Sequence, residues 1–289
     1  MLKAAVLVIG FSISILLLFV PSTIAEDTSQ NILYVGGSGE GNYSSIQQAI
    51  NDAQPSDTLW VFNGTYEETL LIDKPLILHG ENKTTTIIDA QHQDNVIKLT
   101  RDQVTITGFT LQNSKHEFPY AGVGVYSQGN MVVDNIMIDN YYGMVLIDPA
   151  SRNLIEQNHM ADNKQCGIYF SGATKNILRD NSIHNQPFNG FGLYDFSDHN
   201  QMYNNTLSAN ELNGINIRDS YNNTVYNNTF IDNTYGVHMP PPMFQNILGE
   251  NTYNNNEVNL DEEAPSFMPS LVASVILTLF GFVIIRKKA

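Results

Sequence analysis

Apolar and polar positions alternate in a repeating pattern through the second half of the chain. Two apolar columns recur every 23 or 24 residues: Val132, Ile155, Leu178, Met202, Val225 and Leu248, then Met137, Met160, Ile183, Leu207 and Phe230. After a glycine in each unit, alternate residues are apolar again, as at Ile168 and Phe170. Alternation with a period of two predicts short strands that each bury one face.

Asparagine recurs in the same units, followed by a glycine. The first column contains Asn130, Asn153, Asn176, Asn200, Asn223 and Asn246, and the second contains Asn135, Asn158, Asn181, Asn205, Asn228 and Asn251. The glycines are Gly143, Gly167, Gly190, Gly214 and Gly236. Three short strands and three bends in each unit predict one coil of a parallel β-helix. Leucine-rich repeats have a similar length but require more leucines and fewer asparagines.

Equivalent residues of successive coils would stack about 4.8 Å apart. Inward asparagines in one column can then form a ladder of amide hydrogen bonds, and we expect this of the first two columns. In the third column Gln186 replaces asparagine, which favours exposed turn residues there. Asparagine and glycine are expected to form the bends, because both tolerate a left-handed backbone.

Upstream the pattern is weaker. The stretch QVTITGFTLQN (103–113) matches a unit with Gly108 in the place of the second asparagine, and KHEFP (115–119) reads as an insertion. Earlier strands are predicted at TLWVF, PLILHG, TTIID and NVIKLT. Before them, SSIQQAINDA predicts an amphipathic helix, with Ser44 and Gln47 as a capping box. Because solenoids need capped ends, we expect this helix to cover the N-terminal end of the core.

The stretch YSSIQQAINDAQPSDTLWVFNGTYEETLLIDKPLILHGENKTTTIID resembles the opening of pectin-lyase-like right-handed β-helix proteins. More narrowly, it is similar to the NosD-like parallel β-helix repeat surface proteins common in archaea. The resemblance covers about residues 32–259. It implies right-handed coiling and a helix-capped N-terminal end, and it admits lyases, glycosidases, epimerases and copper-site maturation proteins as relatives.

Both ends of the chain carry apolar segments. Residues 1–25 have the layout of a secretory signal peptide. Residues 267–285 are uncharged, long enough as a helix for about 28 Å of membrane, and followed by Arg286, Lys287 and Lys288. A single-pass anchor with a cytoplasmic C-terminus and an extracellular body is therefore predicted. The tail also resembles archaeal C-terminal sorting signals, although APSFMPS departs from their Pro-Gly-Phe form.

These features divide the chain into five parts. They are a signal peptide (1–25), an N-terminal segment with the helix (26–57), an all-β single-stranded parallel β-helix (58–260), an acidic linker (261–266) and a transmembrane anchor (267–289). With 10 basic and 29 acidic residues, the body between signal peptide and anchor has a formal charge of −19. So acidic a surface repels phosphate backbones, which argues against nucleic-acid binding. Cys166 is the only cysteine, so no intrachain disulfide is expected.

Stacking would align acidic residues in two places. Asp139 would lie over Asp162, and Asp195 over Asp219 with Arg218 beside it. Such carboxylates could bind Ca²⁺ or divide acid and base roles, but strand-end aspartates are also ordinary turn residues. The chain has no lyase or hydrolase motif and no GGxGxD calcium repeat. A cofactor is therefore not expected, and a non-catalytic role is favoured.

Histidines and tyrosines supply the other candidates. His159 and His184 lie one coil plus two residues apart and could approach each other, although two ligands are weak evidence for copper. The remaining histidines form no column. Outward tyrosines could contact sugar rings, and the candidates are Tyr169, Tyr194, Tyr203 and Tyr226. Six sequons, which are glycan acceptors by position in an exported protein, occur at Asn42, Asn63, Asn82, Asn204, Asn222 and Asn227.

Three functional hypotheses follow. The first is a membrane-anchored extracellular β-helix with a structural, adhesive or carbohydrate-binding role, whose partners are surface polysaccharide or other surface proteins. The second is a polysaccharide lyase, hydrolase or epimerase. The third is a copper-handling accessory protein.

Overall fold

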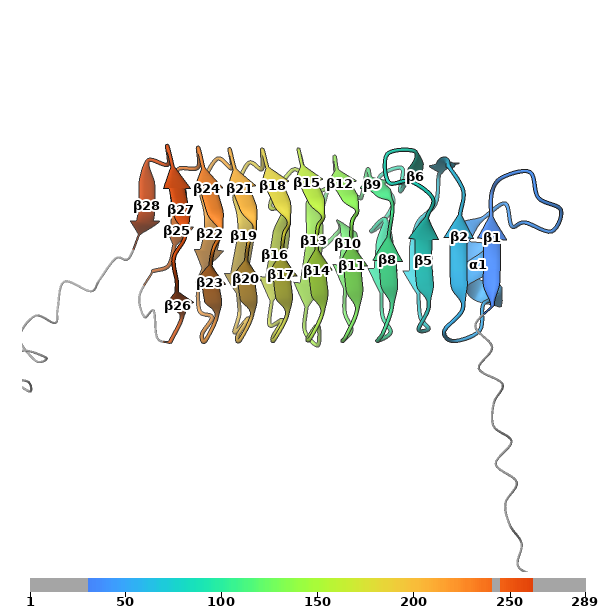
Figure 1. The fold of residues 1–289 in the computed structure, drawn as a ribbon, viewed down its shortest axis with the longest axis horizontal. Coiled ribbons are helices and arrows are strands. Elements are labelled where there is room, and N and C mark those ends of the chain that lie inside the picture. The colour runs from blue at the N-terminus through green and yellow to red at the C-terminus, as the bar shows by residue number, and fades with distance from the viewer. Residues whose placement is uncertain (1–30, 241–244, 262–289) are drawn as a thin grey trace, which may run out of the picture.

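The computed structural model describes residues 31–240 and 245–261, which form a parallel β-solenoid of about ten coils with one short helix (Figure 1). Three parallel sheets run along its length. The first sheet contains β1 (Ile32–Val35), β2 (Thr58–Val61), β5 (Ile77–Gly80), β8 (Thr105–Thr107), β11 (Met131–Val133), β14 (Leu154–Glu156), β17 (Ile177–Arg179), β20 (Gln201–Tyr203), β23 (Thr224–Tyr226) and β26 (Ile247–Leu248).

The second and third sheets each contain nine strands in the described residues. The second is formed by β3 (Gly64–Tyr66), β6 (Thr86–Asp89), β9 (Thr110–Gln112), β12 (Ile136–Ile138), β15 (His159–Ala161), β18 (Ser182–His184), β21 (Thr206–Ser208), β24 (Thr229–Ile231) and β27 (Thr252–Asn254). The third is formed by β4 (Leu70–Ile72), β7 (Ile97–Leu99), β10 (Ala121–Val125), β13 (Tyr142–Ile147), β16 (Ile168–Ser171), β19 (Asn189–Tyr194), β22 (Asn213–Ile217), β25 (Tyr235–His238) and β28 (Val258–Asp261).

The repeat length in the sequence equals the separation between paired residues of successive coils. Val132 pairs with Ile155 and Ile155 with Leu178, so each coil places its apolar side chains directly under those of the next. These side chains fill one continuous core along the solenoid axis. The predicted parallel β-helix is confirmed, and pairing begins upstream of residue 58, because β1 already pairs with β2.

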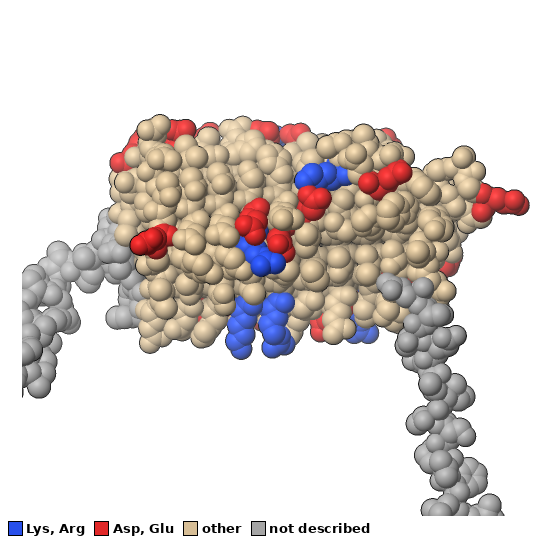
Figure 2. All heavy atoms as spheres, in the orientation of Figure 1, with Lys and Arg blue, Asp and Glu red and all other residues tan. Residues whose placement is uncertain are grey.

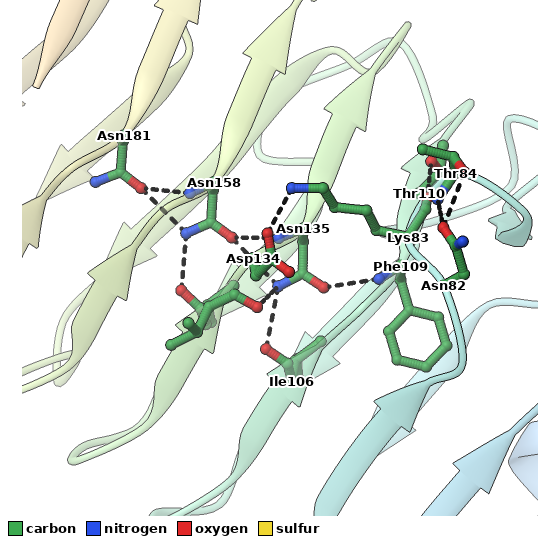
Figure 3. Close-up of polar contacts among 12 residues, drawn as sticks. Asn82, Lys83, Thr84, Ile106, Phe109, Thr110, Asp134, Asn135, Asn158 and Asn181 are labelled. Carbon is green, nitrogen blue, oxygen red and sulfur yellow. Dashed lines mark hydrogen bonds and ion pairs between the residues drawn. The ribbon is translucent and has the colours of Figure 1, made fainter.

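Asparagine ladders run through the interior beside this core. The Oδ1 atom of Asn158 accepts from the Nδ2 and backbone N–H of Asn135, and Asn181 does the same for Asn158 (Figure 3). The first column repeats this geometry, with Asn153 Oδ1 2.9 Å from Asn130 Nδ2. The strand corners, where backbone groups leave the sheet pattern, thereby keep their hydrogen bonds inside the coil.

The third polar column is a ladder too, so the expectation that it is exposed was wrong. Asn140, Asn210 and Asn233 are at most 2 % exposed, and Asn210 Nδ2 donates to Asn233 Oδ1 at 2.9 Å. Gln186, at 0 % exposure, stays inside as well. Its longer side chain leaves Oε1 without a hydrogen-bond partner, which interrupts the ladder rather than turning it outward.

The residues that make the bends are not the ladder asparagines. Each buried asparagine of the second column follows a residue with φ between 54° and 58°, namely Asp134, Gln157, Asp180, Asn204 and Asn227. The glycine column has no positive φ either. A Cβ on Gly143, Gly167, Gly190 or Gly214 would lie 2.5–2.8 Å from the carbonyl oxygen of the next glycine in the column. Glycine is therefore required there for close approach between coils, not for its backbone freedom.

The coil before the first full repeat differs from the expected alignment. Thr107 pairs with Val133 and Thr110 with Ile136, which puts Phe109, not Gly108, opposite Asn135. The Phe109 ring is buried, and its backbone N–H donates to Asn135 Oδ1 at 3.1 Å (Figure 3). The asparagine ladder therefore ends at the backbone N–H of Phe109, whose ring is buried at this position instead of an asparagine side chain.

The helix α1 (Ile46–Asp52) lies at the N-terminal end, with Ile46, Ala49 and Ile50 joined to the solenoid core. Its N-cap is Ser45, not Ser44, so the predicted capping box was wrong. Glu68, from the first coil, completes the cap. Its carboxylate accepts from Ser45 Oγ at 2.7 Å and from the first two helical N–H groups at 2.9 and 3.0 Å.

The signal peptide (1–25), most of the linker (262–266) and the anchor (267–289) lie outside the described residues. Within the described part, no helix is long and apolar enough to cross a membrane. The side of the solenoid drawn in Figure 2 carries a mixed cluster of acidic and basic side chains near its middle as well as charges along its edges and at one end, with uncharged areas between them.

Candidate ligand-binding face

The outer surface of the third sheet carries a cluster of aromatic and amide side chains. We call it the aromatic–amide face and define it by Phe118, Tyr142, Tyr169, Tyr194, Asn189, Asn213 and Asn216. Its strands β10, β13, β16, β19 and β22 are neighbours in the sheet. Tyr169, Tyr194 and Asn216 alternate with core residues of their strands and therefore point away from the core. Tyr142, Asn189 and Asn213 stand directly before the glycine column and join the face through their contacts with these residues or with one another.

The aromatic rings contact one another along the solenoid axis. The centroids of Tyr142 and Tyr169 are 5.3 Å apart, and those of Tyr169 and Tyr194 are 5.1 Å apart with the rings 28° from parallel. Phe118 stands edge-on to Tyr169 at 5.7 Å and is 51 % exposed. It belongs to the predicted insertion 115–119, which therefore adds an aromatic ring to the face.

A chain of amides continues from the rings. Asn213 Nδ2 donates to Asn189 Oδ1 at 2.6 Å, and Asn189 Nδ2 donates to the Tyr194 hydroxyl at 3.0 Å. Asn216 Nδ2 also donates to that hydroxyl, at 3.3 Å. Gly192 allows this arrangement, because a Cβ there would lie 2.7 Å from Tyr194 Cε2. The Tyr194 ring thus lies against the strand backbone with its hydroxyl held by two amides.

Two acceptors of this chain have no partner among the described residues, Asn213 Oδ1 and Asn216 Oδ1. Asn213 is only 5 % exposed. A buried amide oxygen without a partner loses its hydration and gains nothing in return. Both oxygens are closed to solvent in this conformation, so a ligand donor would reach them only after neighbouring side chains move.

The hydroxyl and thiol groups of the face are protonated at neutral pH. Burial raises the pKa of the Tyr142 and Tyr194 hydroxyls, and nearby Cys166 adds to this effect. Burial also raises the pKa of the Cys166 thiol to about 11. At neutral pH neither the tyrosine hydroxyls nor the Cys166 thiol is therefore a nucleophile, because only the deprotonated forms react.

The carboxylate candidates Asp139 and Asp162 lie at the bends. Asp139 and Asp162 both have a φ of 55°; the first lies 3.9 Å from Lys164 Nζ, and the second accepts from Asn185 Nδ2. A left-handed turn conformation accounts for both aspartates.

The second acidic pair also occupies bends. Asp195 accepts from Ser171 Oγ at 2.9 Å, and Asp219 lies 3.7 Å from Arg218 Nε. Both are left-handed turn residues, with φ of 55° and 50°. Their stacking follows the period, but each carboxylate has its own local partner.

The four candidate tyrosines separate into two stacks on different sheets. Tyr203 and Tyr226 stack on the first sheet with centroids 4.9 Å apart and rings 13° from parallel. Tyr169 and Tyr194 belong to the aromatic–amide face. Sequence reasoning missed Asn189, Asn213 and Asn216 on this face. The signal for the first two was their common position directly before Gly190 and Gly214.

The histidine candidates do approach each other. His159 Nε2 and His184 Nε2 are 3.1 Å apart on the outer surface of the second sheet. His79 instead stacks on Trp60 with the ring centroids 4.4 Å apart, and the His92 and His116 rings meet at a tilt of 60° with centroids 4.4 Å apart.

The sequons occupy surface positions. Asn63, Asn82, Asn204 and Asn227 are exposed, whereas Asn42 and Asn222 are partly buried. Asn204, Asn222 and Asn227 are left-handed bend residues, which explains why an asparagine-rich repeat contains these triplets.

The sequence profile of the family described as "Periplasmic copper-binding protein (NosD)" matches residues 79–268, more than half of the chain. The chain belongs to the NosD family. No curated protein sequence matches it.

Solved structures similar to this NosD family member share its fold at low identity. The catalytic unit of a GH87 α-1,3-glucanase from Streptomyces thermodiastaticus matches with a TM-score of 0.62 and 19 % identity, over 75 % of this chain and 44 % of that one. Pectate lyase Pel9A matches with a TM-score of 0.58 and 14 % identity, over 82 % and 79 %. Pectin methylesterase from carrot matches with a TM-score of 0.58 and 11 % identity, over 81 % of this chain and 88 % of that one.

The family description names copper, which would require side chains able to bind a metal ion. The described residues contain no group of three or more His, Cys, Asp and Glu side chains able to hold a metal ion. The His159–His184 pair offers two imidazole nitrogens, a ligand type that suits Cu²⁺. The described part of this NosD family member therefore brings together two imidazole nitrogens but no set of three or more such side chains.

Proposed function

We propose that this NosD family member is a non-catalytic, carbohydrate-binding β-helix module held at the outer surface of the cell membrane. One observation carries the proposal: aromatic rings stack in a row on the third sheet, directly beside two amide oxygens that have no partner in the described residues. The predicted signal peptide and anchor place this face outside the cell.

A carbohydrate ligand would suit both the aromatic rings and the amides of the face. Sugar rings present C–H surfaces that pack on aromatic side chains, and their hydroxyls donate hydrogen bonds. Phe118 and Tyr169 would supply the packing surface, and Asn213 Oδ1 and Asn216 Oδ1 would accept from hydroxyls. The amides and tyrosine hydroxyls carry no charge, which favours a neutral sugar.

Binding without catalysis is supported by what surrounds the face. Asp195 already accepts from Ser171 Oγ and Asp219 already lies beside Arg218, so each carboxylate has a local partner. The solved enzymes with this fold are at most 19 % identical in the comparisons above, so they support the fold alone.

Binding is tested on a glycan array with the full chain purified in detergent. We expect binding to neutral polysaccharides without release of new reducing ends. Tyr169→Ala should weaken it at least tenfold, because the central ring of the row is lost. Tyr203→Ala is the matched control, since it opens a similar tyrosine stack on the first sheet, outside the aromatic–amide face. Absence of binding, equal effects of both substitutions, or cleavage of the glycan would each overturn the proposal.

A further inference from the structure

The two ends of the solenoid differ in how their backbone and core are covered. At the N-terminal end α1 packs on the core, and Gln47 Oε1 accepts from the backbone N–H of Leu71 at 2.7 Å. Lys74 Nζ also donates to the carbonyl oxygen of Asn51 at 2.9 Å, near the end of the helix. At the opposite end β26, β27 and β28 are the outermost strands of the three sheets in the described residues (Figure 1).

The core columns become exposed in this last coil. One coil earlier, three core residues are 0 % exposed: Val225, Phe230 and Val237. Their paired residues are Leu248, Tyr253 and Leu260. Leu260 is 36 % exposed and the other two are only partly buried, while Ile247 at the rim is 61 % exposed. An apolar cross-section of the core therefore reaches the surface at the C-terminal end.

The asparagine ladders end in backbone donors around this cross-section. The last rungs are Asn246, Asn251 and Asn256, whose amide oxygens accept from backbone N–H groups of the preceding coil at 2.9–3.0 Å. Within the described residues no coil follows that could accept from their own N–H groups in the same way. This end therefore suits a partner that combines hydrogen-bond acceptors with an apolar part.

The sequence after β28 indicates which partner lies there. Residues 262–266 separate β28 from the predicted membrane anchor, so six Cα–Cα steps join Asp261 to Phe267. Fully extended, six steps reach at most about 20–22 Å. The predicted anchor is apolar on every side, whereas a helix that caps a core in water needs one polar face. The membrane surface is therefore a better partner for the open end than the anchor segment itself.

We propose that the open C-terminal end of the solenoid docks on the outer surface of a zwitterionic lipid bilayer, so that the solenoid stands upright with α1 farthest from the membrane. The inference rests on the membrane attachment contained in the proposed function. Phosphate and ester oxygens of lipid headgroups accept hydrogen bonds, and the boundary with the acyl chains accommodates apolar and tyrosine side chains.

Charge and length complete this arrangement. The last coil carries the exposed carboxylates of Glu250 and Glu257, which disfavour an anionic lipid surface. The ten strands of the first sheet give nine spacings of about 4.8 Å, so β1 would stand about 43 Å above β26. The aromatic–amide face would then run away from the membrane along the side of the solenoid.

Contact quenching of the full chain in phosphatidylcholine nanodiscs tests the docking. Asn254→Cys on β27 and Gln48→Cys on α1 introduce exposed thiols for a bimane fluorophore, while the buried Cys166 stays unlabelled. A nitroxide on the lipid headgroup quenches only fluorophores that touch it. We expect at least threefold stronger quenching at position 254 than at position 48. Equal quenching at the two positions would overturn the upright docking.

Two isoleucines provide a matched pair of substitutions. Ile247 and Ile32 belong to one outward column at opposite ends of the first sheet, and they are 61 % and 54 % exposed. In labelled Asn254→Cys, Ile247→Asp should reduce quenching at least twofold, because a carboxylate resists entry into the interface. Ile32→Asp should leave it unchanged. Equal effects of the two substitutions would refute docking through the open end.

The unaltered chain supplies a probe at the capped end. Trp60 is the only tryptophan and lies on β2, next to the first strand of the sheet. Its fluorescence should not respond to nitroxide headgroups, and strong quenching would overturn the upright orientation. Failure of the chain to float with vesicles would refute the anchor and the docking together. Glycan binding on the array requires no bilayer, so it can succeed where the docking fails.

Discussion

Asn158 Oδ1 accepts hydrogen bonds from the backbone N–H of Asn135 at 3.1 Å and from its Nδ2 at 3.2 Å. The Asn158 Nδ2 atom in turn donates to Val132 O at 2.7 Å and to Asn181 Oδ1 at 3.1 Å. One side chain thus satisfies polar groups of the two coils on either side of its own. Asp would keep the acceptor but lose both donors and bury a charge, so only the amide fits.

Loss of one ladder amide is expected to destabilise the solenoid. Asn158→Ala removes a hydrogen-bond partner from buried groups of both neighbouring coils, which should reduce the free energy of unfolding by about 2–4 kcal/mol. Urea denaturation followed by fluorescence measures it. Asn204→Gly is the control, because Asn204 is an exposed bend residue with φ of 58° and should cost less than about 1 kcal/mol. Equal costs for the two variants would refute the ladder as a stabilising element.

The glycine column should not tolerate a methyl group. In Gly190→Ala the new Cβ would lie 2.6 Å from both Gly214 O and Leu207 Cδ2. Overpacking of this kind costs about 1–3 kcal/mol. The control is Gly129→Asn, where no atom lies within 4 Å of an added Cβ and asparagine accepts the φ of +64°. Thermal unfolding should show a lower midpoint for the first variant and little change for the second.

Glu68 is predicted to stabilise the helix from outside it. Its carboxylate accepts from Ser45 Oγ and from the N–H groups of Ile46 and Gln47. Glu68→Ala should lower stability by about 1–3 kcal/mol. The neighbouring Glu67 is exposed, so Glu67→Ala should have almost no effect. Circular dichroism melting of both variants distinguishes a cap from a general effect of charge.

Stability should fall in mild acid because of His79. Burial against Trp60 lowers the pKa of His79 below its ordinary 6.5. The unfolded chain therefore takes up this proton at a higher pH than the folded chain. The contribution is complete above about pH 6.5 and is lost as the pH falls toward the folded-state pKa. His79→Gln should show a weaker decrease between pH 7 and pH 5 in urea titrations; an identical pH dependence would contradict the assignment.

The thiol of Cys166 should be inert in the folded chain. It is 5 % exposed, and burial raises its pKa to about 11. Iodoacetamide at about pH 8 should leave it unmodified until urea unfolds the protein. Mass spectrometry of the two samples checks this, and rapid alkylation of the native chain would show that the third sheet opens.

The repeat in the sequence was sufficient to predict the coil, its three strands and the axial neighbours of each residue. Asn135 lies under Asn158, and Val132 under Ile155, because a period of one coil is also the register of parallel pairing. The insertion at 115–119 was predictable for the same reason, as it interrupts the period. Axial neighbours are therefore a direct consequence of sequence spacing.

Contacts between side chains that do not lie in one column were decided only by the tertiary structure. The burial of Gln186, the Phe109 register, the Glu68 cap and the facing nitrogens of His159 and His184 all depend on how side chains turn across a coil. The same holds for Asn213 reaching Asn189 beside the Tyr194 hydroxyl. Spacing alone cannot specify these contacts, because bend geometry and side-chain rotation determine which residues of adjacent columns meet.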